Sequence, residues 1–167
     1  MPADNASCPL CERTRDHAAA LRIAALRESV VFLHEHQAYL GWCVVVLKDH
    51  AEHLGGLPVA RQLRLWEDVA QVAAAVQRAF TPARINYECL GNVIGHVHWH
   101  VIPRYGAAGS TGFQPVVQHH GQDGRGTDPD PRSTVWTRPA AERDCGVTAE
   151  LAAELIGRLR KAGLPDM

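Results

Sequence analysis

The sequence predicts an α+β fold, with a mostly antiparallel sheet of about five strands, one long helix and one C-terminal helix. Two pairs of apolar, β-branched stretches predict neighbouring strands, and a long segment with helical periodicity separates the two pairs. The 167 residues, of which 46% are hydrophobic, suffice for one domain with its own core. We therefore expect a single domain over residues 1–167.

The first half of the chain supplies a short helix and the first pair of strands. Residues 15–26 are rich in Ala and Leu, which predicts a short helix. SVVFLHEH (29–36) and GWCVVVLKD (41–49) are rich in β-branched residues and predict two strands with a tight connection, as in a hairpin. A loop, HAEHLGGLP, follows the second strand.

The long helix is predicted from Pro58 to about residue 80, where Thr81-Pro82 ends it. Its apolar residues recur every three or four positions, which predicts one buried face. These residues are Val59, Leu63, Trp66, Val69, Ala73, Val76 and Phe80. Residues 84–90 and 96–104 predict the second pair of strands.

The last third of the chain changes in composition. Gly, Pro, Asp, Ser and Thr dominate residues 106–139, which predicts a long flexible loop. Residues 147–163 then predict an amphipathic helix.

Charge and composition exclude several kinds of partner. The net charge is −1 and there is no run of Lys or Arg, so we expect no nucleic-acid partner. The most apolar stretch, GWCVVVL, is too short to span a bilayer, and the first residues lack the apolar core of a signal peptide. Five cysteines, an odd number, favour reduced thiols. We expect a soluble cytoplasmic protein without a membrane partner.

The stretch GHVHWHVIPRY (95–105) places three histidines at alternate positions. Because side chains alternate between the faces of a strand, His96, His98 and His100 share one face, and the apolar residues between them face the core. Leaving a buried imidazole donor or acceptor unpaired costs about 1–3 kcal/mol, so packing alone does not favour such a row. Two functions fit the row: metal ligation, or covalent chemistry with one histidine as nucleophile.

A second pattern, CPLC, lies near the start of the chain. Cys8 and Cys11 have the two-residue gap that lets two thiolates reach one metal ion. A redox role would require a thioredoxin-like βαβ context, which the sequence lacks. One such pair is only half of a zinc site, and a cysteine pair that holds no metal stays an alternative.

HVHWHVIPR resembles the signature of the histidine triad (HIT) family, in which three histidines alternate with apolar residues. The resemblance extends over most of residues 8–105, including CPLC and the LGNV loop. It implies the family's α+β fold, a nucleotide substrate and a homodimer. GWCVVVLKDHAEHLGGLP and NYECLGNVIGHVHWHVIPRY are similar to a bacterial branch described as diadenosine tetraphosphate hydrolase-like.

The resemblance implies a nucleotidyl hydrolase or transferase that acts on dinucleoside polyphosphates or nucleoside phosphoramidates. His98 would attack the α-phosphorus and form a nucleotidyl-histidine, with a ring nitrogen that donates to a backbone carbonyl. His100 would bind a phosphate oxygen or assist the leaving group. Two alternatives stay open: a nucleotide-binding adaptor with little turnover, and a zinc hydrolase with all three histidines as ligands.

Further roles follow from the same resemblance. Asn92 and the backbone of Gly91 stand where the family holds phosphate oxygens, while Val93 stands where many relatives have Ser. Glu35, or else His34 or His36, would grip the ribose hydroxyls.

The resemblance also completes the zinc site. In zinc-carrying members, the counterparts of His50 and His96 join those of Cys8 and Cys11 around a structural ion, and His53 is a competing ligand. We expect no catalytic cofactor.

Overall fold

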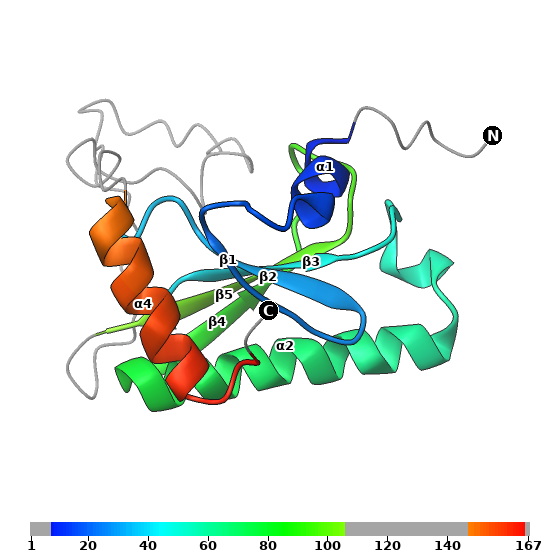
Figure 1. Ribbon diagram of the computed structural model, residues 1–167. Helices are drawn as coiled ribbons and strands as arrows, with labels where there is room; N and C mark the ends of the chain where they lie inside the picture. Colours follow the sequence, from blue (N-terminus) through cyan, green and yellow to red (C-terminus); the bar gives the residue numbers. More distant parts are fainter. Residues whose placement is uncertain (1–7, 106–146, 166–167) are drawn as a thin grey trace, which may run out of the picture.

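A five-stranded antiparallel sheet forms the centre of the computed structural model, which describes residues 8–105 and 147–165 (Figure 1). In their order across the sheet, the strands are β1 (Arg22–Ala25), β2 (Ser29–Leu33), β3 (Cys43–Leu47), β5 (His98–Arg104) and β4 (Arg84–Glu88). The predicted α+β fold is confirmed. The predicted loop at 106–139 lies outside the described residues, and the single domain over residues 1–167 stays a prediction.

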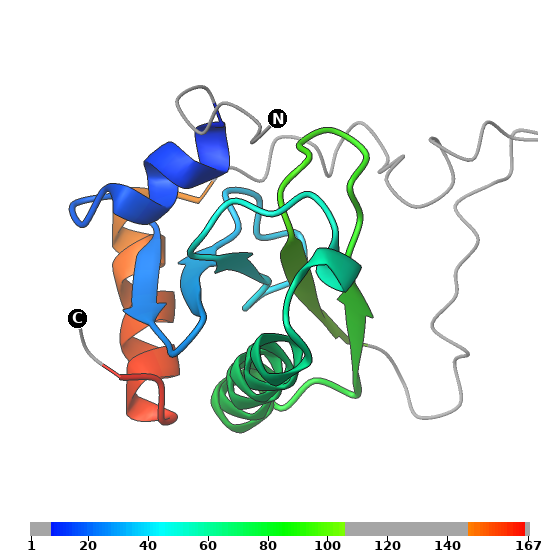
Figure 2. The same cartoon turned by 90° about the vertical axis from the view of Figure 1, so that its right-hand side faces the viewer.

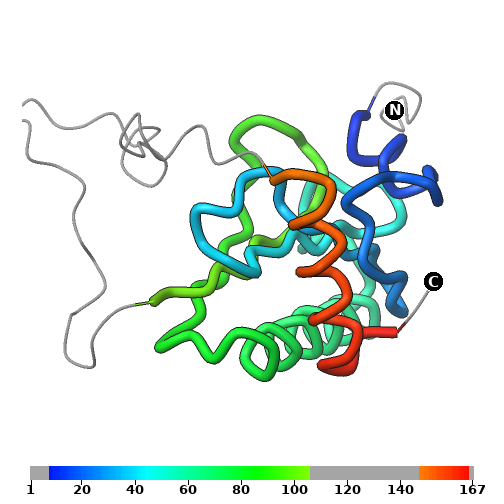
Figure 3. The backbone as a smooth tube through the Cα atoms, turned by 60° about the vertical axis from the view of Figure 1, so that its left-hand side comes forward, coloured from blue at the N-terminus to red at the C-terminus, as the bar shows by residue number. Residues whose placement is uncertain are grey.

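Helices lie on both faces of the sheet. They are α1 (Pro9–Arg15), the 3-10 turn η1 (Leu54–Gly56), α2 (Val59–Phe80) and α4 (Ala149–Lys161). In Figure 2, α2 runs below the sheet and α1 lies above it. Figure 3 shows the C-terminal end of α4 beside α2, where the Arg78 guanidinium donates to the Ala162 carbonyl at 2.7 Å. Among the described helices, none is both long and apolar enough to span a membrane.

The strand β2 is buried along its whole length because both of its faces are covered. Val31 and Leu33 pack in the larger core with α2 and α4. Val30 and Phe32 point the other way, into a smaller cluster with Leu10 of α1. The alternation therefore produces two apolar layers from one short strand.

The helix predicted at residues 15–26 is wrong. The helix α1 ends at Arg15, and β1 (Arg22–Ala25) pairs antiparallel with β2. Pro9 begins α1 at a position where its missing N–H costs nothing. The Ala-rich segment becomes an edge strand because pairing with β2 buries Ile23 and Ala24, which outweighs the weak helical preference of Ala.

The predicted apolar face of α2 is right only in its second half. Val69, Ala73, Val76 and Phe80 are buried. The first half differs, because the exposed fractions of Val59, Leu63 and Trp66 are 68%, 60% and 46%. At this end of the helix, polar side chains point toward the sheet instead.

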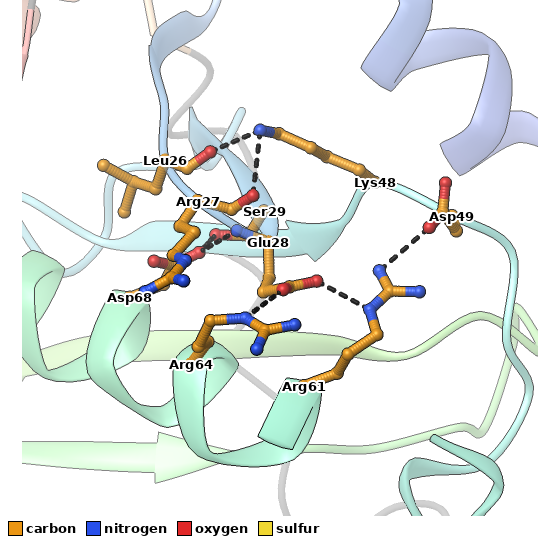
Figure 4. Close-up of polar contacts among 9 residues, drawn as sticks. All are labelled: Leu26, Arg27, Glu28, Ser29, Lys48, Asp49, Arg61, Arg64 and Asp68. Atoms are coloured by element: carbon orange, nitrogen blue, oxygen red, sulfur yellow. Dashed lines mark hydrogen bonds and ion pairs between the residues drawn. The ribbon is translucent and has the colours of Figure 1, made fainter. Parts of the chain in front are cut away.

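Figure 4 shows these polar contacts. The Glu28 carboxylate accepts hydrogen bonds from Arg61 at 2.7 Å and from Arg64 at 2.5 Å. One carboxylate oxygen of Asp68 accepts from the Glu28 backbone N–H at 2.9 Å and the Ser29 hydroxyl at 2.7 Å. This end of α2 is therefore attached to the start of β2 by charge and hydrogen bonds rather than by apolar packing.

The connection between β2 and β3 is tightly built. Gly41 has φ +89°, and a Cβ there would lie 2.4 Å from the Phe80 ring, so glycine is required. The Gln37 amide accepts from Gly41 N–H at 2.8 Å and donates to the Trp42 carbonyl at 3.0 Å. These contacts fix Trp42 at the entry to β3.

Candidate active site and metal centre

The triad lies where the alternation predicted it. Val97, Trp99 and Val101 are buried on the α2 side of the sheet. His98 and His100 occupy the opposite face, where they pair in register with Val46 and Val44 of β3. We call this the histidine face; it continues onto Val30 and Phe32 of β2. The two rings are part-buried, with centroids 5.3 Å apart and an interplanar angle of 72°.

His98 has a defined tautomer. Its Nδ1 lies 2.6 Å from the carbonyl oxygen of His96. A carbonyl oxygen can only accept, so Nδ1 carries the proton, and in the neutral ring Nε2 holds a lone pair. A lone pair at Nε2 on a part-buried ring is what a nucleophilic imidazole requires.

His96 has the opposite tautomer. Its Nε2 lies 2.8 Å from the Leu47 carbonyl oxygen and therefore donates, which leaves the lone pair on Nδ1. This Nδ1 lies 3.4 Å from the sulfur of Cys8 and 3.4 Å from the sulfur of Cys11. Burial lowers the pKa of His96, with a further contribution from the neighbouring His50 and His98, against the backbone hydrogen bond. The ring is thus suited to bind a metal ion as neutral imidazole.

The candidate metal cluster joins α1 to the segments around the triad. The Nδ1 of His50 lies 3.4 Å from the Cys11 sulfur. The ligand atoms of Cys8, Cys11, His50 and His96 all lie within 4.8 Å of one another, and this set could hold a metal ion. Two thiolates and two imidazoles are a common tetrahedral zinc set. His53 is exposed and is not part of the cluster.

His100 has a partner that the sequence reasoning missed. The Trp42 indole Nε1–H donates to His100 Nδ1 at 3.2 Å. His34 stacks on the same indole, with ring centroids 3.8 Å apart and planes 5° apart. Burial, together with His98 and His34, lowers the pKa of His100 to about 3, so the ring is neutral near pH 7. The alternation in GWCVVVL places residues 42, 44 and 46 on one face, but it does not show which strand lies beside that face.

Glu88 is a second residue that the sequence analysis did not single out. It pairs in register with His100, so its side chain lies on the histidine face. Burial raises the pKa of its carboxyl group, against the charge of Arg104. Among the described residues, one of its carboxyl oxygens is buried without a hydrogen-bond partner.

The remaining predicted residues lie on loops. Gly91, Asn92 and Val93 are all exposed in the loop that leads to the triad, and the exposed fraction of Val93 is 93%. Glu35 follows β2; its carboxylate is 3.9 Å from the His36 ring and its backbone carbonyl accepts from Val147 N–H at 3.0 Å. Glu35 and His36 line a groove of about 790 Å³ beside α4. None of the described residues that line this groove is a triad histidine.

The comparisons with known proteins agree with this geometry. A family model described as the HIT domain matches residues 16–107, more than half of the chain. Protein hit of Bacillus subtilis is 25% identical over 122 residues, which cover 70% of this chain and 83% of that protein. A histidine triad protein from Sinorhizobium meliloti has a similar structure, with 22% identity, a TM-score of 0.61 and coverage of 85% of this chain and 88% of that chain. A Hit-like protein of Bartonella henselae, described as involved in cell-cycle regulation, has 16% identity, a TM-score of 0.67 and coverage of 95% and 97%. The chain belongs to the HIT domain family.

Proposed function

We propose that this protein is a nucleotidyl hydrolase or transferase that works through a nucleotidyl-histidine at His98. The observation that carries the proposal is the hydrogen bond from His98 Nδ1 to the His96 carbonyl, because it reserves the Nε2 lone pair for attack. The neighbouring ring of His100 is uncharged and supplies a second polar group beside the proposed nucleophile.

The proposed reaction has two displacements. His98 Nε2 forms a bond to the α-phosphorus as the bond to the leaving group breaks, and the leaving group departs with the bonding electrons. Water, or another acceptor, then attacks the same phosphorus and releases a proton to solvent, and the bond to Nε2 breaks with its electron pair returning to the His98 ring. Dividing one difficult displacement into two lowers each barrier, and hydrogen bonds to the phosphate oxygens stabilise the transition states.

The proposed substrates are dinucleoside polyphosphates or nucleoside phosphoramidates, as in the diadenosine tetraphosphate hydrolase-like branch. Asn92 and the Gly91 backbone are the proposed ligands of the phosphate oxygens, beside Val93. Glu35 is the proposed ribose ligand. The exposure of all four residues supports this part of the proposal, because a bound nucleotide could reach them.

A structural zinc ion is proposed at Cys8, Cys11, His50 and His96. The Nδ1 lone pair of His96 is directed at the two cysteine sulfurs, which supports this ligand set. The ion would tie α1 to the start of the triad strand and leave His98 and His100 for the substrate. The reduced thiols that zinc requires favour the cytoplasm as the proposed compartment.

A homodimer is the proposed assembly. Leu63 and Trp66 on α2 and Tyr87 on the edge strand β4 are large apolar residues with exposed fractions of 60%, 46% and 48%. Trp66 contacts Trp99 of β5, with ring centroids 4.5 Å apart. The exposed apolar residues of α2 therefore lie next to strand β5. Exposed apolar surface of this kind is typical of a protein–protein interface.

The test compares His98→Ala with His53→Ala, which removes an exposed histidine outside the metal cluster. We expect His98→Ala to lose hydrolysis of diadenosine tetraphosphate and of adenosine phosphoramidate by on the order of 10⁴-fold or more, with an unchanged fold. Mass spectrometry of the intact, rapidly quenched wild-type protein should detect a covalent nucleotide that the variant lacks. Full activity in His98→Ala would remove the nucleophile. A wild-type protein that binds nucleotide without turnover would favour the adaptor alternative.

A further inference from the structure

The Trp42 side chain lies between the triad residue His100 and a histidine outside the triad, His34. The indole is fully buried, and its ring lies parallel to that of His34 with 3.8 Å between centroids. At the indole edge, Nε1 lies 3.2 Å from His100 Nδ1. His34 is held in turn by its own Nδ1, which lies 3.1 Å from the backbone nitrogen of His36.

The direction of the hydrogen bond between Trp42 and His100 is fixed by the indole. The indole N–H of tryptophan is a donor and has no acceptor capacity. The Nδ1 of His100 must therefore be the unprotonated nitrogen, and the proton of the neutral ring lies on Nε2. We propose that Trp42 is a positioning residue that fixes His100 as an Nε2–H donor toward a phosphate oxygen or the leaving-group atom; this inference rests on the proposed function.

The fold prevents the indole from moving away from His100. Gln37 holds the backbone on both sides of this turn, because its amide donates to the carbonyls of His34 and Trp42 and accepts from Gly41 N–H. His34 covers one face of the indole, and the ring of Tyr39 lies 5.9 Å away at 57°. These contacts restrict the rotamer of the indole and keep its N–H directed at His100.

His98 and His100 then have opposite tautomers. His98 presents a lone pair at Nε2, whereas His100 presents a proton at Nε2. A nucleophile and a hydrogen-bond donor on one phosphate group require this opposition. The depressed pKa of His100 is consistent with it, since the donor stays uncharged over the physiological range.

The first measurement uses the wild-type protein. Long-range proton–nitrogen correlation spectra of the histidine rings should show His100 with Nδ1 unprotonated and Nε2 protonated, and with a scalar coupling across the hydrogen bond to Trp42 Nε1. The signals can be assigned with a His100→Gln variant. A spectrum with the proton on Nδ1 of His100 would overturn the inference without any variant having to fold.

The second measurement uses Trp42→Phe, which keeps an aromatic ring against His34 but removes the N–H donor. We expect a mixture of His100 tautomers and a loss in kcat of roughly 10- to 100-fold, with little change in KM. The loss should be larger for adenosine phosphoramidate, whose leaving amine is basic, than for a nitrophenyl ester of AMP. Trp66→Phe is the matched control, because it makes the same substitution on α2, on the other side of the sheet.

Two results of the variant would count against the inference. An unchanged His100 tautomer in folded Trp42→Phe, whatever its activity, would show that the indole does not set the proton position. A tautomer mixture with full kcat on both substrates would show that the position of this proton does not matter for the reaction. If the wild-type protein turns over neither substrate, the proposed function fails, while the spectra still decide the assignment of the tautomer.

Discussion

His96, His98 and His100 share one face of a chain segment, yet each ring has a different partner for its nitrogens. His96 donates through Nε2 to Leu47, His98 donates through Nδ1 to the His96 carbonyl, and His100 accepts at Nδ1 from Trp42. Because a neutral imidazole has one donor and one acceptor, each partner decides which nitrogen remains for chemistry. The row is therefore three different groups: a proposed metal ligand, a proposed nucleophile and a proposed hydrogen-bond donor.

The metal ligands give a prediction at the scale of single residues. Cys11→Ser should lose bound zinc and lower the thermal unfolding temperature, because metal-ligand bonds contribute directly to folding free energy. Cys89→Ser is the matched control, since that thiol is free and exposed and lies outside the cluster. Elemental analysis and thermal unfolding with and without chelator measure both effects. Purified wild-type protein without zinc, together with an unfolding temperature that chelator does not change, would contradict the prediction.

Short spacings could predict the Cys8–Cys11 pair and the row of three histidines, whereas His50 and His96 joined the two cysteines only through the resemblance to the HIT family. The alternation over residues 96–101 was enough to place His98 and His100 opposite the buried Val97, Trp99 and Val101, and the structure confirms this, although it buries His96. Trp42 was missed because its role depends on which strand lies beside β5. Strand order is a property of the tertiary structure, so no local pattern specifies that β3 brings residue 42 to His100.

At the scale of secondary-structure elements, the helix predicted at residues 15–26 failed for a related reason. Ala and Leu favour a helix by only a few tenths of a kcal/mol per residue, relative to other residues. Pairing with the fully buried strand β2 makes backbone hydrogen bonds and buries Ile23 and Ala24. Local preference is decisive only where tertiary contacts do not oppose it, as in the second half of α2, where the predicted positions are buried.

The attachment of α2 to the sheet gives a prediction at this scale. Glu28 is buried between Arg61 and Arg64. Burial alone would raise the pKa of its carboxyl group, but the hydrogen bonds and charges of the two arginines together lower it. The charged form is thus preferred in the folded protein, and Glu28→Gln should reduce the free energy of unfolding by about 1.5–3 kcal/mol at neutral pH.

The sign of the pH dependence follows from the lowered pKa. The unfolded chain binds a proton at higher pH than the folded protein does, so the Glu28 contribution is present above the unfolded value of about 4.3. The contribution is lost as pH falls through the folded pKa. Denaturant unfolding at a series of pH values should show the difference between wild type and Glu28→Gln shrink below about pH 4. Glu67→Gln, on the exposed side of α2, is the control, and an equal difference at all pH values would contradict the charge-based attachment.

At the scale of the whole molecule, the sheet and α2 both leave surface that a second copy can cover. The strand β4 is an edge strand, with only β5 beside it among the described strands. An exposed edge offers unpaired backbone groups to another chain. The polar attachment through Glu28 occupies the first half of α2, where Leu63 and Trp66 are exposed. The apolar surface of the proposed dimer and the network that holds the helix thus lie on the same half of α2.

Charge placed on this surface tests the assembly. We expect wild-type protein to be a dimer by light scattering, and Trp66→Glu and Leu63→Glu each to shift it toward monomer, because a carboxylate buried in an apolar interface loses its hydration. Val93→Glu changes an apolar residue that is 93% exposed and lies away from α2, and it should leave the dimer intact. The activity of the monomeric variants should also be measured, because a single copy of the chain already contains the triad and the candidate metal cluster. A monomeric wild-type protein, or dimers that persist in both α2 variants, would show that this face is not the interface.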